Sequence, residues 1–68
     1  MEVVESSRDE VVVKLNHEDI IMFRSAIGET LEALEDWELP IRTPFSREEF
    51  LVVQEQLKQL KSLLRGGH

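Results

Sequence analysis

Both prolines and the only tryptophan of this 68-residue chain fall in one stretch, residues 37–50, which separates two helical patterns. A proline disfavours the α conformation of the residue before it. Pro40 and Pro44 therefore predict that Leu39 and Thr43 are extended and that no helix runs through the stretch. The chain must consist of two separate helices joined by a connector.

The second helix has a clear start signal. Ser46 is a good N-cap, and Glu49, three residues on, can reach back to the amide of Ser46 to form a capping box. Phe45 and Phe50 stand at hydrophobic-staple spacing across this start. The pattern predicts a helix over residues 46–65, which two glycines end.

The first helix has a start of the same form. Asn16 is the expected cap and Asp19 stands at the third helical position. Leu15 and Ile20 have the staple spacing. The apolar periodicity that follows predicts a helix over residues 17–37.

On both helices, apolar residues recur at alternating steps of three and four and so share one stripe. Two matched stripes with a short connector predict a mainly α fold, an antiparallel αα-hairpin. Each stripe is broader than one helix covers, which favours a two-fold homodimer that forms a four-helix bundle. The alternative is a monomer whose amino-terminal strands cover the helices. The stripe residues are Ile20, Phe23, Ile27, Leu34 and Trp37, then Phe50, Val53, Leu57, Leu60 and Leu64.

The first 16 residues are expected to be extended, because their valines are β-branched and suit strands. Polar residues 6–9 fit the turn of a β-hairpin, although they lack the usual glycine. Two alternatives stay open: residues 10–15 pair with a second copy, or residues 1–9 have no fixed structure. The chain is interpreted as one domain, residues 1–68, with a tail at 66–68.

The composition of the chain excludes several classes of partner and of binding site. The net charge of −6 argues against nucleic acid and anionic membranes as partners, and its ordinary explanation is solubility. The absence of cysteine excludes disulfides and thiolate metal sites. No secretory signal pattern and no apolar run of about 20 residues occurs, so we expect a cytoplasmic protein.

No group of residues has the pattern of a catalytic or metal site. His17 lacks a histidine partner one turn on, and a surface position in the first helical turn is its expected role. Glu48 and Glu49 are neighbours on a helix and point in different directions. The serines lack a histidine–acid partner set, and no glycine-rich phosphate loop is present. We expect no enzyme activity, no cofactor and no bound metal.

The acidic end of the first helix is the least routine feature. Five acids and no base lie between Ser25 and Ile41, and negative charge there opposes the helix dipole. The functional hypothesis is a surface for a basic protein partner. The favoured ordinary interpretation is a solvated face, neutralised by Arg42 or Arg47. Trp37 could anchor a partner, but core packing is preferred. The candidate partner-binding residues are Glu32, Glu35, Asp36, Glu38 and Arg42.

One resemblance covers residues 23–60. The run Ala26-Ile27-Gly28-Glu29, then Trp37-Glu38-Leu39, Ile41-Arg42-Thr43 and Ser46-Arg47-Glu48-Glu49, resembles a loose group of small bacterial helical-hairpin proteins. That group often has glycine where this chain has Pro44, and asparagine where it has Gly28. Some members look like immunity or antitoxin proteins. The resemblance implies an immunity-like or antitoxin-like protein. Together with the acidic end of the first helix, it leads us to expect a binding protein, an immunity-like inhibitor of a basic partner; the alternative is a structural subunit of a larger bacterial complex.

Overall fold

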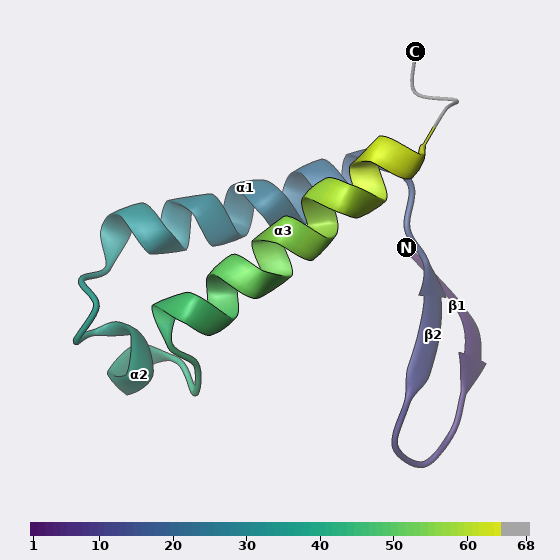
Figure 1. Cartoon of the computed structure of the whole chain (residues 1–68). Coiled ribbons are helices and arrows are strands. Elements are labelled where there is room, and N and C mark those ends of the chain that lie inside the picture. The colour runs from purple at the N-terminus through teal and green to yellow at the C-terminus, as the bar shows by residue number, and fades with distance from the viewer. Residues whose placement is uncertain (65–68) are drawn as a thin grey trace.

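A computed structural model describes residues 1–64 of the chain. The fold is mainly helical, with a two-stranded antiparallel sheet at the amino terminus (Figure 1). The elements in order are β1 (Glu2–Ser6), β2 (Val11–Lys14), α1 (His17–Ala33), α2 (Leu39–Arg42) and α3 (Arg47–Leu63).

The two strands form the β-hairpin that the valine pattern predicts. Val3 lies opposite Val13 and Ser6 opposite Val11, with a bulge between Val3 and Glu5. The turn has no glycine. Its ends are joined through Ser7, whose amide donates to the Glu10 carbonyl at 2.8 Å and whose hydroxyl accepts from the Glu10 amide at 3.2 Å. A serine side chain thus replaces part of the backbone bonding of a tight turn.

Both predicted capping boxes are present. The Asn16 side chain accepts from the amide of Asp19 at 2.8 Å, and the Asp19 carboxylate accepts from the amide of Asn16 at 3.1 Å. Ser46 and Glu49 exchange the same two bonds at 3.3 and 3.2 Å. These reciprocal bonds satisfy amides that the first helical turn leaves without partners, which fixes both helix starts.

The predicted end of the first helix is wrong. α1 ends at Ala33, and Leu34 is extended at φ −114° and ψ 139°. The last turn of α1 carries no basic residue, so nothing there offsets the acids that follow. Instead, the Glu38 carboxylate accepts from the amide of Glu35 at 3.0 Å and begins a new turn. Trp37 is 67% exposed beyond the helix, so its predicted core position is also wrong.

The prediction that Leu39 is extended before Pro40 is wrong as well. Leu39 and Pro40 open the short helix α2, where proline is tolerated because first-turn amides need no helical partner. The side chain of Leu39 is completely buried, and this burial outweighs the local preference of a residue before proline.

α3 ends at Leu63, two residues before the predicted end. Residues 65–68, which include the two glycines expected to end the helix, lie outside the described part of the chain. The amide of Leu64 bonds the carbonyl of Lys61 at 3.2 Å and closes the last turn.

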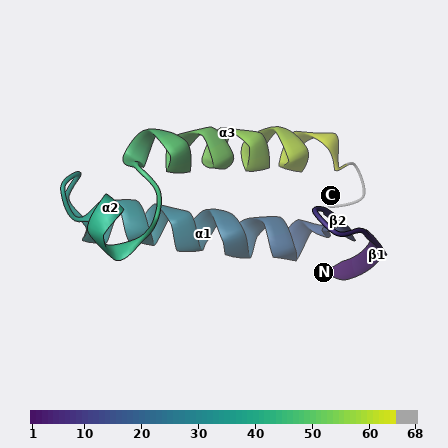
Figure 2. The ribbon, with the colours of Figure 1, turned by 90° about the horizontal axis from the view of Figure 1, so that it is seen from below.

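α1 and α3 lie side by side and run in opposite directions (Figure 2). Within residues 1–64, only Ile20, Leu39 and Leu57 have buried side chains. The β-hairpin and α2 project from the same side of the helix pair, one at each end (Figure 1). The molecule therefore has the shape of a bracket: the helix pair forms its long side, and the β-hairpin and α2 form its two ends. The side from which they project is the open side.

Candidate protein-binding surface

Two apolar hollows lie along the helix pair. The first has a volume of about 490 Å³ and the second about 260 Å³. Together their apolar lining forms what we call the apolar face. It consists of Ile27, Phe45, Phe50, Val52 and Val53 at the α2 end, and of Val13, Leu15, Ile20, Leu60, Leu63 and Leu64 at the β-hairpin end.

Helix geometry puts both hollows on the same side of α3. Val53 and Leu60 are seven residues apart, which is close to two full turns at 3.6 residues per turn. Val52 and Leu63 flank them on the same side. All four are exposed, by between 42% and 71%. The α3 side chains that line the two hollows therefore share one side of the helix.

The apolar face continues onto the β-hairpin. Residues two apart on a strand share a face, and directly paired residues do so too, so Val3, Val11 and Val13 point to one side. Val13 lines the second hollow. Val3 and Val11 are 63% and 59% exposed, so the hairpin adds valines that nothing in the described chain covers.

At the α2 end, two aromatic rings build the wall of the first hollow. Phe45 and Phe50 meet edge to face, with ring centroids 6.0 Å apart, in the staple position that the sequence predicts. Glu49 also lines this hollow, but its carboxylate is bonded to the amide of Ser46. The wall is therefore fixed by the start of α3.

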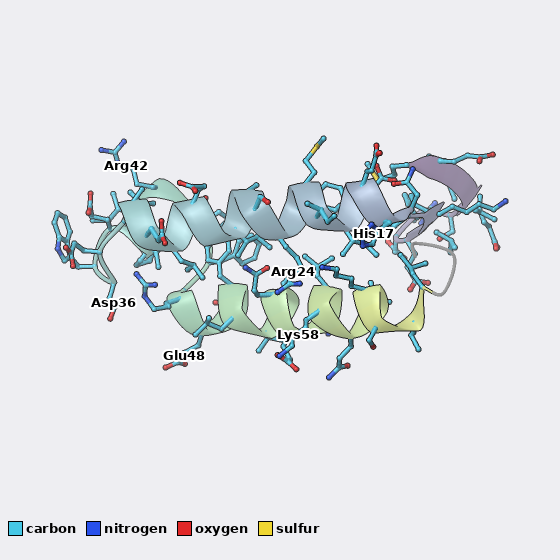
Figure 3. The ribbon with its side chains drawn as sticks, turned by 90° about the horizontal axis from the view of Figure 1, so that it is seen from above. His17, Arg24, Asp36, Arg42, Glu48 and Lys58 are labelled. Carbon is cyan, nitrogen blue, oxygen red and sulfur yellow. The ribbon has the colours of Figure 1, made fainter. Side chains whose placement is uncertain are left out.

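The opposite side of the helix pair carries several polar side chains, among them Arg24, Gln54 and Lys61. Arg24 lies there between α1 and α3 (Figure 3). Gln54 donates to the backbone carbonyl of Arg24 at 3.1 Å, which ties the two helices together. Gly28 faces this amide, since a Cβ added to it would lie 3.8 Å from the Gln54 nitrogen. One side of the pair thus carries interhelical polar contacts and the other is apolar.

Arg47, the first residue of α3, holds the end of α1. Its guanidinium donates to the carbonyl of Leu31 at 3.2 Å and to that of Leu34 at 2.8 Å, and it forms an ion pair with Asp36. These carbonyls have no helical partner, because the last turn of a helix leaves its acceptors free. Arg47 therefore caps α1 and neutralises Asp36, which lies beyond the end of that helix.

The predicted acidic site is only partly brought together. Asp36 is paired with Arg47, and Glu38 is bonded to the amide of Glu35. The side chains of Glu32 and Glu35 are exposed. Arg42 and Asp36 project from opposite sides of the turn (Figure 3). Within residues 1–64, neither Glu32 nor Glu35 forms an ion pair.

Sequence reasoning missed two features of the turn. Leu39, taken as a connector residue, is buried, and Ile41 is 72% exposed. The available signal for Leu39 was an apolar side chain between a run of acids and a proline. Its burial depends on how the connector folds back, which a periodic pattern does not encode.

At the β-hairpin end, the amine of Met1 lies 2.8 Å from the carboxylate of Asp19. This amine, and the bond from the amide of Asn16, hold the pKa of Asp19 below its usual value of 3.8. His17 is half-buried at the start of α1 (Figure 3). Within residues 1–64, no cluster of three or more histidines and acids has the arrangement to hold a metal ion.

No helix among the described residues has the length and apolar character needed to cross a membrane. Comparison of the chain with known proteins gives no matching family model, no matching curated protein and no matching solved structure.

Proposed function

We propose that this chain is a protein–protein interaction module without catalytic activity, and that the apolar face is its binding site. The observation that carries the proposal is the pair of hollows on one side of α3, in which eleven of the twelve described lining residues are apolar. Contiguous exposed apolar surface of this kind marks protein contact sites. The mainly aliphatic lining and its two phenylalanine rings suit the apolar side chains of a second protein.

In this proposal, α1, the connector and α3 act as one helical hairpin, and another protein covers its apolar face. Three buried side chains make a small core, since full burial of one aliphatic side chain contributes roughly 1.5–3 kcal/mol. Burying Val53 and Leu60 against another protein would add to it. A four-helix bundle, as predicted from the sequence, is one way to close the open side.

The test is capture of binding proteins by the tagged full chain from an extract of the source cells. Val53→Glu places a charge in the first hollow and should abolish capture of proteins that the unmodified chain retains. Leu51→Glu is the matched control, because Leu51 is an exposed apolar residue of α3 that lines neither hollow. If both variants retain the same proteins as the unmodified chain, the apolar face is not the binding site.

A second candidate function is an immunity-like inhibitor that binds a basic partner at the turn. The observation that favours it is the exposure of Trp37 (67%) and Ile41 (72%) in the segment that follows the exposed acids Glu32 and Glu35. Tryptophan is enriched among the residues that dominate binding energy at protein interfaces. If the apolar face instead docks on a larger assembly, the chain is a structural subunit of that assembly.

The acidic candidate can be tested separately. Reversing Glu32 and Glu35 to lysine, while leaving Asp36 on Arg47, should abolish capture of a basic partner without unfolding the chain. Glu55→Lys, at an exposed acid of α3, is the control for added positive charge. Unchanged capture by the reversed variant would rule out this candidate.

A further inference from the structure

We infer that the occupant of the apolar face is a second copy of this chain, seated helix pair against helix pair, with each β-hairpin lying along the partner. The inference rests on the proposed function and names its partner. The exposed area, the charge of the face and the reach of the β-hairpin support it independently.

The exposed area of the chain is too large for its mass. The accessible surface is 5752 Å². A folded monomer of 7.9 kDa exposes roughly 4,400 Å², so the excess is on the order of 1,000 Å². A stable interface removes about 800 Å² or more from each partner. The excess is therefore of the size that one copy of a dimer buries.

The radius of gyration also exceeds the value expected for a compact monomer of this length. The radius of gyration is 13.9 Å. A compact domain of this length has a radius of gyration of roughly 11 Å. A second copy placed on the open side of the bracket would fill the space between the β-hairpin and α2.

The charge of the apolar face favours the chain itself as the partner. The chain carries a net charge of −6, so two copies repel unless their contact surfaces lack charge. Among residues 1–64, Glu49 is the one ionisable residue that lines either hollow, and its carboxylate is already bonded to the amide of Ser46. A basic partner would therefore find no unbonded carboxylate in either hollow. A second copy of the chain, in contrast, would meet no repelling negative charge there.

The small residues of α1 on this side allow a second helix to approach. Ala26 and Thr30 follow Phe23 at spacings of three and seven, so the three residues share one side of α1. The hydroxyl of Thr30 donates to the carbonyl of Ala26 at 2.8 Å, so it needs no bond from a partner. This part of α1 can be covered without leaving a polar group unpaired.

The β-hairpin is long enough to reach past the partner's helices. Its longer strand has five residues and spans about 16 Å at 3.3 Å per residue. Packed helix layers are about 8–10 Å apart. The hairpin therefore extends alongside the second helix pair, and its exposed valines, Val3 and Val11, contact the partner.

The test is the molar mass of the full chain by light scattering across a concentration series. We expect twice 7.9 kDa for the unmodified chain. Val53→Glu should weaken self-association at least 100-fold, and Leu51→Glu should leave it unchanged. On the β-hairpin, Val11→Lys should weaken it, while Val12→Lys, on the other strand face, should not.

A second measurement needs no variant and covers the case in which Val53→Glu fails to fold. The thermal midpoint of the unmodified chain should rise with protein concentration, since mass action stabilises a folded dimer. A monomeric mass and a constant midpoint at every concentration would overturn the inference. The proposed function fails by a different result, namely capture of another protein that Val53→Glu does not affect.

Discussion

The two ends of the helix pair are held in different ways. At the turn end, Leu39 is completely buried, and Arg47 binds two carbonyls of the preceding segment of chain. At the β-hairpin end, Ile20 is buried, but the strands beyond it are exposed at every residue, and an ion pair between Met1 and Asp19 ties them to α1. The turn end is stabilised within one chain, whereas the hairpin end leaves most of its apolar side chains exposed.

The largest effect expected within one chain is at the turn end. Leu39→Ala should lower the free energy of unfolding by about 2–5 kcal/mol, because it leaves a cavity where a fully buried side chain stood. Ile41→Ala, two residues on and 72% exposed, should change it by less than about 0.5 kcal/mol. Urea unfolding of both variants at one protein concentration measures these changes in the free energy of unfolding. Equal losses would mean that the turn is not anchored by Leu39.

A smaller effect is expected at Arg47. Arg47→Met should cost about 1–3 kcal/mol, because the carbonyls of Leu31 and Leu34 lose their donor. Arg47→Lys should recover only part of this, since an ammonium lacks the planar fork that serves several acceptors at once. The free energies of unfolding of the two variants give the comparison. Full recovery with lysine would show that charge alone holds this end.

The smallest effect is at the β-hairpin end and depends on pH. The pKa of Asp19 is lowered in the folded chain, so its carboxylate stabilises the fold above its unfolded pKa. This stabilisation is lost as the pH falls through the lowered value. The difference in unfolding free energy between the unmodified chain and Asp19→Asn should be constant near neutral pH and shrink below about pH 4. A difference that does not change with pH would exclude an ionic contribution from Asp19.

Local chemistry in the sequence predicts the helix starts and not the turn between the helices. The capping boxes at Asn16 and Ser46 involve residues three apart, so their geometry is set by the local chain. The end of α1 depends on Arg47, which is thirteen residues from Leu34. The apolar stripe continues in sequence to Trp37 after the helix has ended, so periodicity alone extends the prediction too far.

For the candidate site too, the sequence predicts some features and not others. The stripe pattern identifies most of the apolar side chains that line the hollows, including Val53 and Leu60. It does not show that they stay exposed, because exposure depends on where the β-hairpin and α2 lie. The acids of the turn are equally visible in the sequence, but the pairing of Asp36 with Arg47 required the fold.

The bond from Arg47 to the end of α1 also bears on how the chain folds. The β-hairpin and the two helices are built from contacts between residues near one another in sequence, and such structures form rapidly. Joining α1 to α3 requires closure of the short loop between Leu34 and Ser46, and a loop of this length closes at a modest entropic cost. The bracket of a single copy should therefore assemble first. In the dimer that we propose, the encounter of two copies should then set the slow, concentration-dependent phase of refolding.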